Sequence, residues 1–317
     1  MTRRANKTRS LRHSVSILII IFFLLSSASA CAQLKYAVIP ENPRPGDPIT
    51  IGANSGVTEV LLFVNDKQVG KAPFFYIPGE RDLPGFIAAV ITVPSTIDSG
   101  NVVIKLNNAN GQTAAEIPIE LTPREFLSEV IHLDPVNTGI RTDPSPERTQ
   151  QANHLWQILI TTGDQIYHTG PFLPPTTATR RTSFFGSRRI FQYSTGGRDT
   201  SIHAGVDFGV PTGTRVDACG AGKVVLARTR IVTGNSVVLE HGPGIYSLYY
   251  HLDRLNVSEG DMVQTGDLLG YSGSTGLSTG PHLHWEVRVN AENTDPDAFV
   301  ERQIIDKDLL IRKMYNR

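Results

Sequence analysis

Cysteine is almost absent from this chain of 317 residues, which contains only Cys31 and Cys219. Two thiols cannot supply the disulfide framework of a small secreted scaffold, so no such framework supports this fold. Cys219 lies in a small, apolar, strand-like segment and is expected to be a buried, inert thiol. A disulfide between the two cysteines is the alternative.

Clustered positive charge is also lacking. The chain has 30 Lys and Arg and 30 Asp and Glu, and five of the basic residues but no acid lie in residues 1–30. The remainder therefore has 25 basic and 30 acidic residues and is mildly acidic. Nucleic-acid surfaces and polybasic membrane patches need clustered Lys and Arg, so the composition argues against both. The doublets Arg180-Arg181 and Arg188-Arg189 are interpreted as solvated or packed surface.

The chain has no apolar run long enough for a standard membrane-spanning helix. Its longest run, Val15 to Leu25, follows five basic residues and precedes small residues. That arrangement is typical of a secretory signal peptide, which we predict over residues 1–30. Export is therefore expected, and a retained N-terminal anchor is the alternative.

Cys31 follows Ala28-Ser29-Ala30, which resembles a bacterial lipobox, in which the Cys is lipidated and becomes the mature N-terminus. Ala28 departs from the preferred Leu, and the same tripeptide suits ordinary signal peptidase cleavage. We expect a periplasmic lipoprotein held to a membrane through Cys31. Soluble export is the alternative.

Residues 34–122 consist of short apolar runs separated by turn residues. The expected strands are 36–39, 49–51, 59–64, 86–93, 102–106 and 115–121. Strands of this length and spacing predict an immunoglobulin-like β-sandwich. This part contains no His or Cys, so we assign it no chemistry and expect it to space, dock or shield a catalytic site.

Residues 123–180 are interpreted as a short helical connector followed by a linker rich in Pro and Thr. Ser145, with a Pro directly after it, is typical of a helix start. The apolar spacing that follows predicts a single amphipathic helix, with Trp156 as its anchor on the next domain. Residues 171–179 predict an extended linker.

From residue 181 the sequence is dominated by strand-like runs and glycines. The expected strands are 214–218, 222–229, 236–240, 247–251, 268–271 and 282–289. Because no long helical period intervenes, residues 181–303 predict an antiparallel β domain, and residues 304–317 a C-terminal tail. The chain as a whole is predicted to be mainly β. Residues 257–270 resemble biotinyl and lipoyl carriers, but the Lys that a carrier needs is missing.

Five of the nine histidines lie in this last domain. His282 and His284 are two residues apart in a strand-like segment, so their side chains point to the same face. His203 and Asp207 form an H-x-x-x-D pair about eighty residues upstream, and His251 lies between the two pairs. Imidazole and carboxylate are ligands of catalytic zinc, which uses three protein ligands and keeps a fourth position open.

This combination resembles the M23 family of zinc metallopeptidases, the lysostaphin and LytM type that cuts peptidoglycan peptides. The resemblance covers roughly residues 180–300. It rests on the H-x-x-x-D pair, on the Tyr249-x-His251-Leu252 run and on the segment 272–286, which ends in His-Leu-His-Trp-Glu. Trp285 replaces the Phe more often seen in the family.

The resemblance implies that His203, Asp207 and His284 bind one Zn²⁺ in the catalytic domain. Such a site lowers the pKa of water at the metal toward about 7. His251 and His282 are then the two catalytic imidazoles, one moving a proton and the other bonding the oxyanion, in an order that stays open. The alternative places His282 on the metal and leaves His284 free.

Three further residues are expected near the site. Glu286 alternates to the face of the two histidines, where it either orients a metal ligand or forms a plain salt bridge within the strand. Asn235 and Tyr249 are expected to line the groove.

The predicted function is that of an exported zinc metalloendopeptidase that hydrolyses peptide bonds in peptidoglycan stems or cross-links during cell-wall remodelling. The alternative is a non-enzymatic LytM-like regulator that activates a cell-wall amidase or scaffolds division proteins. Such members have typically lost ligands, whereas this chain retains them. A third hypothesis is a carrier or wall-binding module without catalytic activity.

Overall fold

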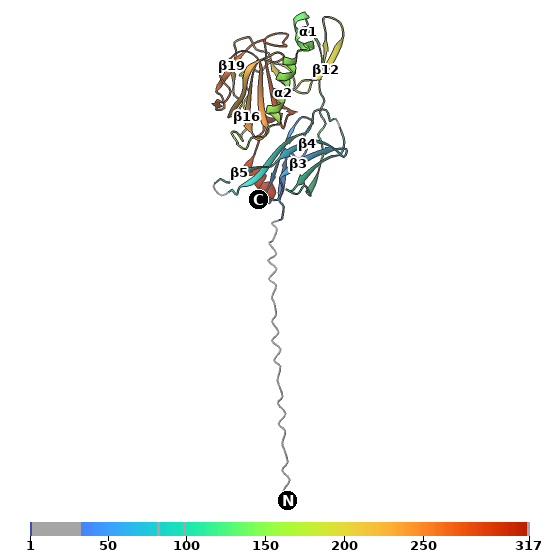
Figure 1. Ribbon diagram of the computed structural model, residues 1–317, viewed down its shortest axis with the longest axis vertical. Coiled ribbons are helices and arrows are strands. Elements are labelled where there is room, and N and C mark those ends of the chain that lie inside the picture. The colour runs from blue at the N-terminus through green and yellow to red at the C-terminus, as the bar shows by residue number, and fades with distance from the viewer. Residues whose placement is uncertain (2–32, 81–82, 98, 316–317) are drawn as a thin grey trace. The chain divides into compact units, whose positions relative to one another are not determined.

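The computed structural model describes Met1 and residues 33–80, 83–97 and 99–315 (Figure 1). The expected signal peptide and Cys31 lie outside these residues, apart from Met1. Residues 34–317 form one compact unit built mainly of antiparallel strands, which confirms the predicted fold class. Within the described residues, no helix has the length and apolar character needed to cross a membrane.

Two four-stranded sheets form the N-terminal part. Their orders are β1-β2-β6-β5 and β4-β3-β7-β8. The strands are β1 (Tyr36–Ile39), β2 (Pro48–Ala53), β3 (Glu59–Val64), β4 (Lys67–Pro73), β5 (Phe75–Ile77), β6 (Phe86–Thr92), β7 (Val102–Asn107) and β8 (Thr113–Ile119). Ile49 and Ile91 of one sheet share an apolar cluster with Leu62 and Ile104 of the other, so the sheets pack as a sandwich. Sequence analysis missed β4 because its polar residues and two lysines hide the strand pattern.

The connector contains more structure than the single helix that we expected. Its elements are β9 (Ser128–His132), α1 (Pro135–Thr142) and α2 (Pro146–Ile160). Helix α2 begins as predicted, with the Ser145 hydroxyl accepting a hydrogen bond from the Arg148 amide. Helix α1 was missed because its eight residues include Gly139 and two threonines, which are weak helix formers.

Trp156 does not anchor α2. Its surface is 53% exposed, whereas Leu155, Ile158 and Leu159 pack against buried residues of the C-terminal sheet. The anchor prediction was therefore wrong, because the apolar stripe of the helix lies on the face that holds Leu159. Figure 1 shows α2 beside the sheet that contains β16.

The C-terminal part is built around a ten-stranded sheet. Its strands are β10 (Arg181–Ser183), β13 (Gly205–Phe208), β14 (Arg215–Asp217), β15 (Gly222–Arg230), β16 (Gly234–Gly242), β17 (Ile245–Leu255), β18 (Met262–Val263), β19 (Leu268–Ser272), β20 (Leu283–Val289) and β21 (Glu292–Thr294). A second sheet joins β9 in parallel to β11 (Arg188–Gln192), which pairs with β12 (Arg198–Ile202). Strand β17 is buried over Ile245–Leu252, so the sheet centre is covered on both faces.

One apolar cluster runs through both parts. It includes Ile77 and Phe86 of the sandwich and Trp285 of the C-terminal sheet. Helix α4 (Lys307–Tyr315), which follows α3 (Pro296–Glu301), contributes Leu310 to the same cluster. The proposed boundaries at 34–122, 123–180, 181–303 and 304–317 stay predictions, since residues 34–317 share this core.

A buried polar network lies inside the C-terminal sheet. His241 donates from Nδ1 to the Ala221 carbonyl at 2.8 Å, and its Nε2 lies 2.7 Å from the Ser247 hydroxyl. Burial lowers the pKa of His241 to about 3. Nearby Cys219 is a free buried thiol, and burial raises its pKa to about 12, as expected of an inert cysteine.

Acid should therefore destabilise this protein through His241. Below the unfolded-state pKa of about 6.5 the unfolded chain gains a proton that the folded chain does not. The free energy of unfolding should fall by about 1.4 kcal/mol per pH unit between about pH 6 and pH 4 from this group. We expect urea unfolding of His241→Gln to show a smaller pH slope than wild type. Parallel slopes in the two proteins would contradict the prediction.

Candidate functional site

The register between β13 and β20 brings two of the expected site residues together. Asp207 pairs directly with His284 across these antiparallel strands, and Tyr250 of β17 pairs with His284 on the other side. Side chains of directly opposite residues lie on one face, about 5 Å apart at Cβ. Gly205 permits this close approach, because a Cβ there would lie 2.1 Å from the Trp285 carbonyl oxygen.

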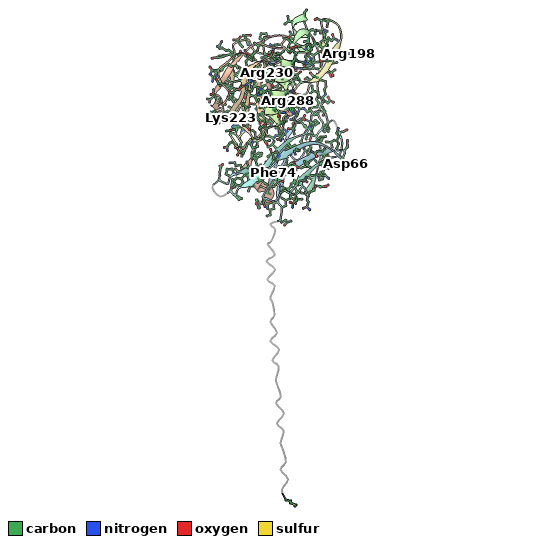
Figure 2. The ribbon with its side chains drawn as sticks, viewed as in Figure 1. Asp66, Phe74, Arg198, Lys223, Arg230 and Arg288 are labelled. Carbon is green, nitrogen blue, oxygen red and sulfur yellow. The ribbon has the colours of Figure 1, made fainter. Side chains whose placement is uncertain are left out.

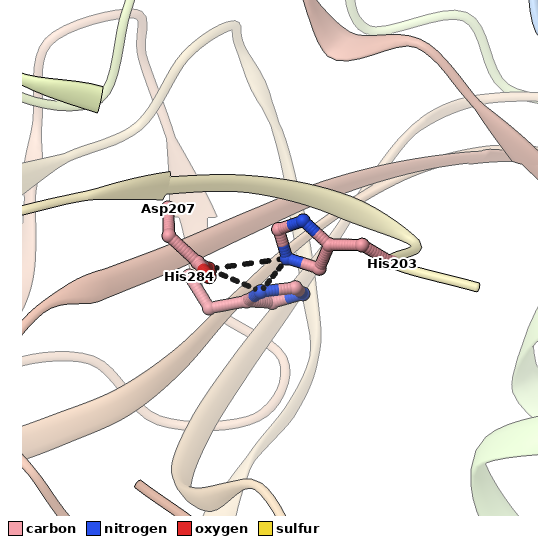
Figure 3. A group of neighbouring side chains, drawn as sticks. All are labelled: His203, Asp207 and His284. Carbon is pink, nitrogen blue, oxygen red and sulfur yellow. Dashed lines mark hydrogen bonds and ion pairs between the residues drawn. The ribbon is translucent and has the colours of Figure 1, made fainter. Parts of the chain in front are cut away.

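His203 completes a three-residue group (Figure 3). It lies in the turn between β12 and β13, where its backbone pairs with Ser187. Its Nε2 is 3.2 Å from Asp207 Oδ1 and 3.0 Å from His284 Nδ1, and the last two atoms are 2.7 Å apart. All three side chains are buried.

These three atoms fit a metal ion. Ligand atoms around a tetrahedral zinc with bonds of about 2.1 Å lie about 3.4 Å apart. The observed distances of 2.7, 3.0 and 3.2 Å are shorter, so the three atoms need only a small outward movement to hold one ion. Nδ1 of His203 lies 2.9 Å from the Phe184 carbonyl oxygen. Because a carbonyl oxygen can only accept a hydrogen bond, Nδ1 carries the ring hydrogen, and the lone pair of Nε2 is free to bind a metal. The donor set of two imidazoles and one carboxylate is a zinc set.

Charged partners hold Asp207 in place. Arg189 of β11 donates to Asp207 Oδ2 at 2.7 Å and to Glu129 of β9 at 3.2 Å. Burial opposes ionisation of Asp207, but His284 and His203 hold its pKa well below the usual value. Arg189 is therefore a half-buried ion partner of the candidate ligand, which fits the packed alternative of its surface interpretation and not the solvated one. The connector strand that carries Glu129 was not predicted, so no sequence signal pointed to this pair.

Glu286 lies on the far side of His284, as its alternation predicted. Its Oε1 is 2.9 Å from His284 Nε2, and Arg288 binds its other oxygen at 2.7 Å. Burial opposes protonation of His284, but Asp207 and Glu286 outweigh it and raise the pKa of His284 to about 9. A carboxylate behind an imidazole is a common orienting partner in metal sites, and a metal ion has to displace this proton.

His251 and His282 lie beside the group, with ring centroids 4.7 Å apart. Nδ1 of His251 is 2.7 Å from the Thr275 carbonyl, and Nδ1 of His282 is 2.8 Å from the Gly280 carbonyl. Both Nδ1 atoms therefore carry hydrogen and both Nε2 atoms keep a lone pair. Burial and the neighbouring His282 lower the pKa of His251 to about 3, and burial lowers that of His282, so both rings are neutral.

Backbone strain marks His251. Its φ of 60° places it in the left-handed region, which residues other than Gly, Asn and Asp rarely adopt. The amide of His251 donates to the Thr233 carbonyl at 2.9 Å, which holds this conformation. Strained residues of this kind occur at functional sites, and here the strained residue places its ring beside His282.

A groove of about 240 Å³ runs over these residues. The four site histidines and Asp207 named from the sequence all line the groove, namely His203, Asp207, His251, His282 and His284, whereas His241 does not. The connector supplies part of the wall through Ile131, Leu133 and Arg141. Asn137 of α1 supports this wall from behind, because its amide group exchanges two hydrogen bonds of 3.1 Å with the backbone of Ser278, which lines the groove.

Two expected groove residues lie elsewhere. Tyr249 is buried on the opposite face of β17, where its hydroxyl accepts from the Cys219 amide at 2.9 Å. Asn235 bonds the Leu252 and Asp253 carbonyls and is not part of the groove wall. Both predictions were wrong; Tyr250, one residue further along the strand, lines the groove and stacks on His284 with ring centroids 5.5 Å apart.

The buried His-Asp-His group and the two neutral imidazoles in one groove supply the donor atoms and proton-transfer groups that metal-dependent hydrolysis requires. The profile of Peptidase family M23 matches residues 201–296, which include all five of these residues. This part of the chain is therefore similar to the members of peptidase family M23.

Two curated relatives and one solved structure illustrate the similarity. The chain is 40% identical over 95 residues to the DD-carboxypeptidase/endopeptidase Mpg of Neisseria meningitidis serogroup B, which covers 30% of this chain and 22% of that protein. It is 37% identical over 127 residues to the peptidoglycan DD-endopeptidase ShyA of Vibrio cholerae, covering 40% and 29%. The chain thus matches less than a third of the length of either relative.

The fold extends further than the sequence match. The crystal structure of a proposed peptidase M23 from Pseudomonas aeruginosa aligns with a TM-score of 0.54 and 22% identity. The alignment covers 81% of this chain and 94% of that one, so the two share a fold over most of their length.

Metal content tests the three-residue group directly. The purified protein should hold about one zinc per chain, and His203→Ala, Asp207→Ala and His284→Ala should each lose most of it, because three ligands are the minimum for a tight catalytic site. His251→Ala and His282→Ala are the matched controls and should keep their metal. Elemental analysis after dialysis reads out the result, and zinc loss in His282→Ala but not in His284→Ala would establish the alternative ligand set.

Proposed function

We propose that this protein is an exported zinc metalloendopeptidase that hydrolyses peptide bonds in the stems or cross-links of peptidoglycan. The observation that supports it most strongly is the convergence of His203, Asp207 and His284 with two neutral imidazoles in one groove of an M23 domain. The two curated relatives described above act on peptidoglycan or carry D,D-peptidase names, which supports the substrate class.

The proposed ligands are His203 Nε2, Asp207 Oδ1 and His284 Nδ1. When bound there, zinc acts as a Lewis acid that activates water and polarises a peptide carbonyl at neutral pH. Arg189 and Glu286 hold the ligands from behind, so the group keeps its geometry as substrate enters.

His251 and His282 supply the proton chemistry. Each presents a neutral Nε2 in the groove, and Nε2 of His282 is 3.9 Å from Asp207 Oδ1, beside the proposed metal position. One ring accepts a proton from the attacking water at Nε2 and delivers it to the leaving amine, while the other takes up a solvent proton at Nε2, donates it in a hydrogen bond to the oxyanion and returns it to solvent when the oxyanion collapses. The Nδ1 bonds to backbone carbonyls fix both rings for these roles.

Peptidoglycan lies outside the cytoplasm, so this function requires export. The signal-like sequence of residues 1–30 supports it, and the lipobox-like site at Cys31 supports attachment to a membrane in the periplasm. A lipid at Cys31 is thus part of the proposal.

Release of soluble fragments from purified peptidoglycan tests the function. We expect the protein to release muropeptides whose masses correspond to cleaved peptide bonds, and a zinc chelator should abolish the release because the metal supplies the Lewis acid. Mass spectrometry of the products identifies the bond. A folded, zinc-loaded protein that releases nothing would contradict the enzymatic function and favour the regulatory alternative.

Substitution of the two free imidazoles separates catalysis from metal binding. His251→Ala and His282→Ala should each lower kcat by about 10²-fold to 10⁴-fold, the usual contribution of a positioned acid or base. Their zinc content and melting temperature should stay close to wild type. His241→Gln is the matched control, since His241 lies outside the groove, and full activity in either groove variant would exclude that residue from the mechanism.

A further inference from the structure

A second cavity adjoins the catalytic groove. It has a volume of about 380 Å³ and lies between α2 and the ends of β15 and β20. Its wall shares Val232, Thr233, Tyr250 and Glu286 with the groove, so the two cavities are direct neighbours. The Tyr250 ring, stacked on His284, separates the second cavity from the proposed metal ligands.

Three arginines dominate this cavity. Arg148 of α2, Arg230 of β15 and Arg288 of β20 line it, and Glu286 is the one carboxylate among its lining residues. Three positive charges against one negative charge leave a net charge of +2. Figure 2 labels Arg230 and Arg288, which lie close together in that view.

Within the described residues, the charge of Arg230 has no ion-pair partner of opposite sign. Its side chain is 9% exposed, and its two terminal nitrogens bond uncharged oxygens, Thr233 Oγ1 at 3.0 Å and the Gln151 carbonyl at 3.3 Å. Its Nε is buried without a hydrogen-bond partner among the described residues. Buried charges in proteins are normally paired, so this guanidinium calls for an anion.

The other two arginines reinforce that requirement. Arg148 donates to the Asp143 carbonyl at 3.1 Å and forms no ion pair within the described part of the chain. Arg288 is bonded to Glu286, but Glu286 also faces His284, so its negative charge is already shared. The planar guanidinium group binds carboxylate through two parallel hydrogen bonds, which makes a carboxylate the matching ligand.

We propose that the cavity lined by Arg148, Arg230 and Arg288 is a substrate subsite that binds a free carboxylate of the peptide cleaved in the adjoining groove. This proposal rests on the proposed peptidase function for the identity of the peptide. The subsite would make the protein select peptides with a free carboxylate. A peptide whose carboxylates are amidated offers no negative charge to Arg230 and should bind weakly.

Binding to metal-free protein tests the subsite without catalysis. The probe is a cross-linked muropeptide dimer, before and after conversion of its carboxylates to carboxamides, titrated calorimetrically in the presence of chelator. Wild type should bind the acid form at least about tenfold more tightly than the amide, the usual range for a charge-assisted pair. Arg230→Gln should remove this preference, and Arg230→Lys should restore part of it.

A matched control lies on the same strand. Arg228 is two residues away, exposed and paired with Glu259, so Arg228→Gln should keep the full preference. Melting temperatures show whether Arg230→Gln is too unstable to interpret. In that case Arg148→Gln, at a less buried position, provides the test and should weaken binding of the acid form. In the zinc-loaded enzyme, Arg230→Gln should raise KM about tenfold for the acid substrate with little change in kcat.

The outcomes separate this subsite from the peptidase function. Equal binding of acid and amide by wild type, or an unchanged preference in both Arg230→Gln and Arg148→Gln, overturns the subsite even if peptidoglycan is cleaved. Arginine-dependent binding of the acid form by a protein that cleaves nothing supports the subsite and rejects the hydrolase.

Discussion

The pairing of Asp207 with His284 across β13 and β20 is the constraint on which the site depends. A shift of one residue in this register would turn one of the two side chains to the opposite face and abolish the group. Gly205 allows the strands to approach at this point, and His203 enters from the turn just before β13. The same register, continued to β17, stacks Tyr250 on His284 and places His251 at the next position of the chain.

Charge balance explains why so many ionisable groups are buried around this pair. The negative charges of Asp207, Glu286 and Glu129 are balanced by positive charges nearby. These are Arg189, Arg288 and His284, whose raised pKa favours its charged form. Each carboxylate touches at least one cation, so the group can stay folded with or without a metal ion. Arg230 stands apart from this balance, because its nearest acceptors are uncharged, and the excess charge faces the cavity next to the groove.

The sequence predicted the mainly β fold, most strands and the grouping of five residues, because alternation and short motifs are local signals. It did not predict Arg189 or Glu129, since their role depends on the parallel pairing of β9 with β11, which joins segments about sixty residues apart. Tyr249 and Tyr250 were confused for a similar reason. Neighbours on a strand face opposite sides, and only the sheet neighbours decide which side is the groove. Trp156 was misassigned because helical spacing alone does not tell which of several apolar residues faces the sheet.

The N-terminal sandwich makes direct hydrogen bonds and apolar contacts with the C-terminal part. Thr92 of β6 and Thr294 of β21 share a hydrogen bond of 2.6 Å, and the Asn290 amide donates to the Val90 carbonyl at 2.9 Å. Leu310 of α4 packs against Gly52 of β2, so the C-terminal helix is seated on the first sheet. The connector also supplies Glu129, which binds the Arg189 partner of Asp207, and Ile131 and Leu133 of the groove wall. A chain shortened to the M23 match would therefore expose apolar surface and lose part of the site wall. The geometry of the candidate site therefore depends on the connector, which supplies part of the groove wall, and the sandwich supports the C-terminal sheet through a shared apolar core.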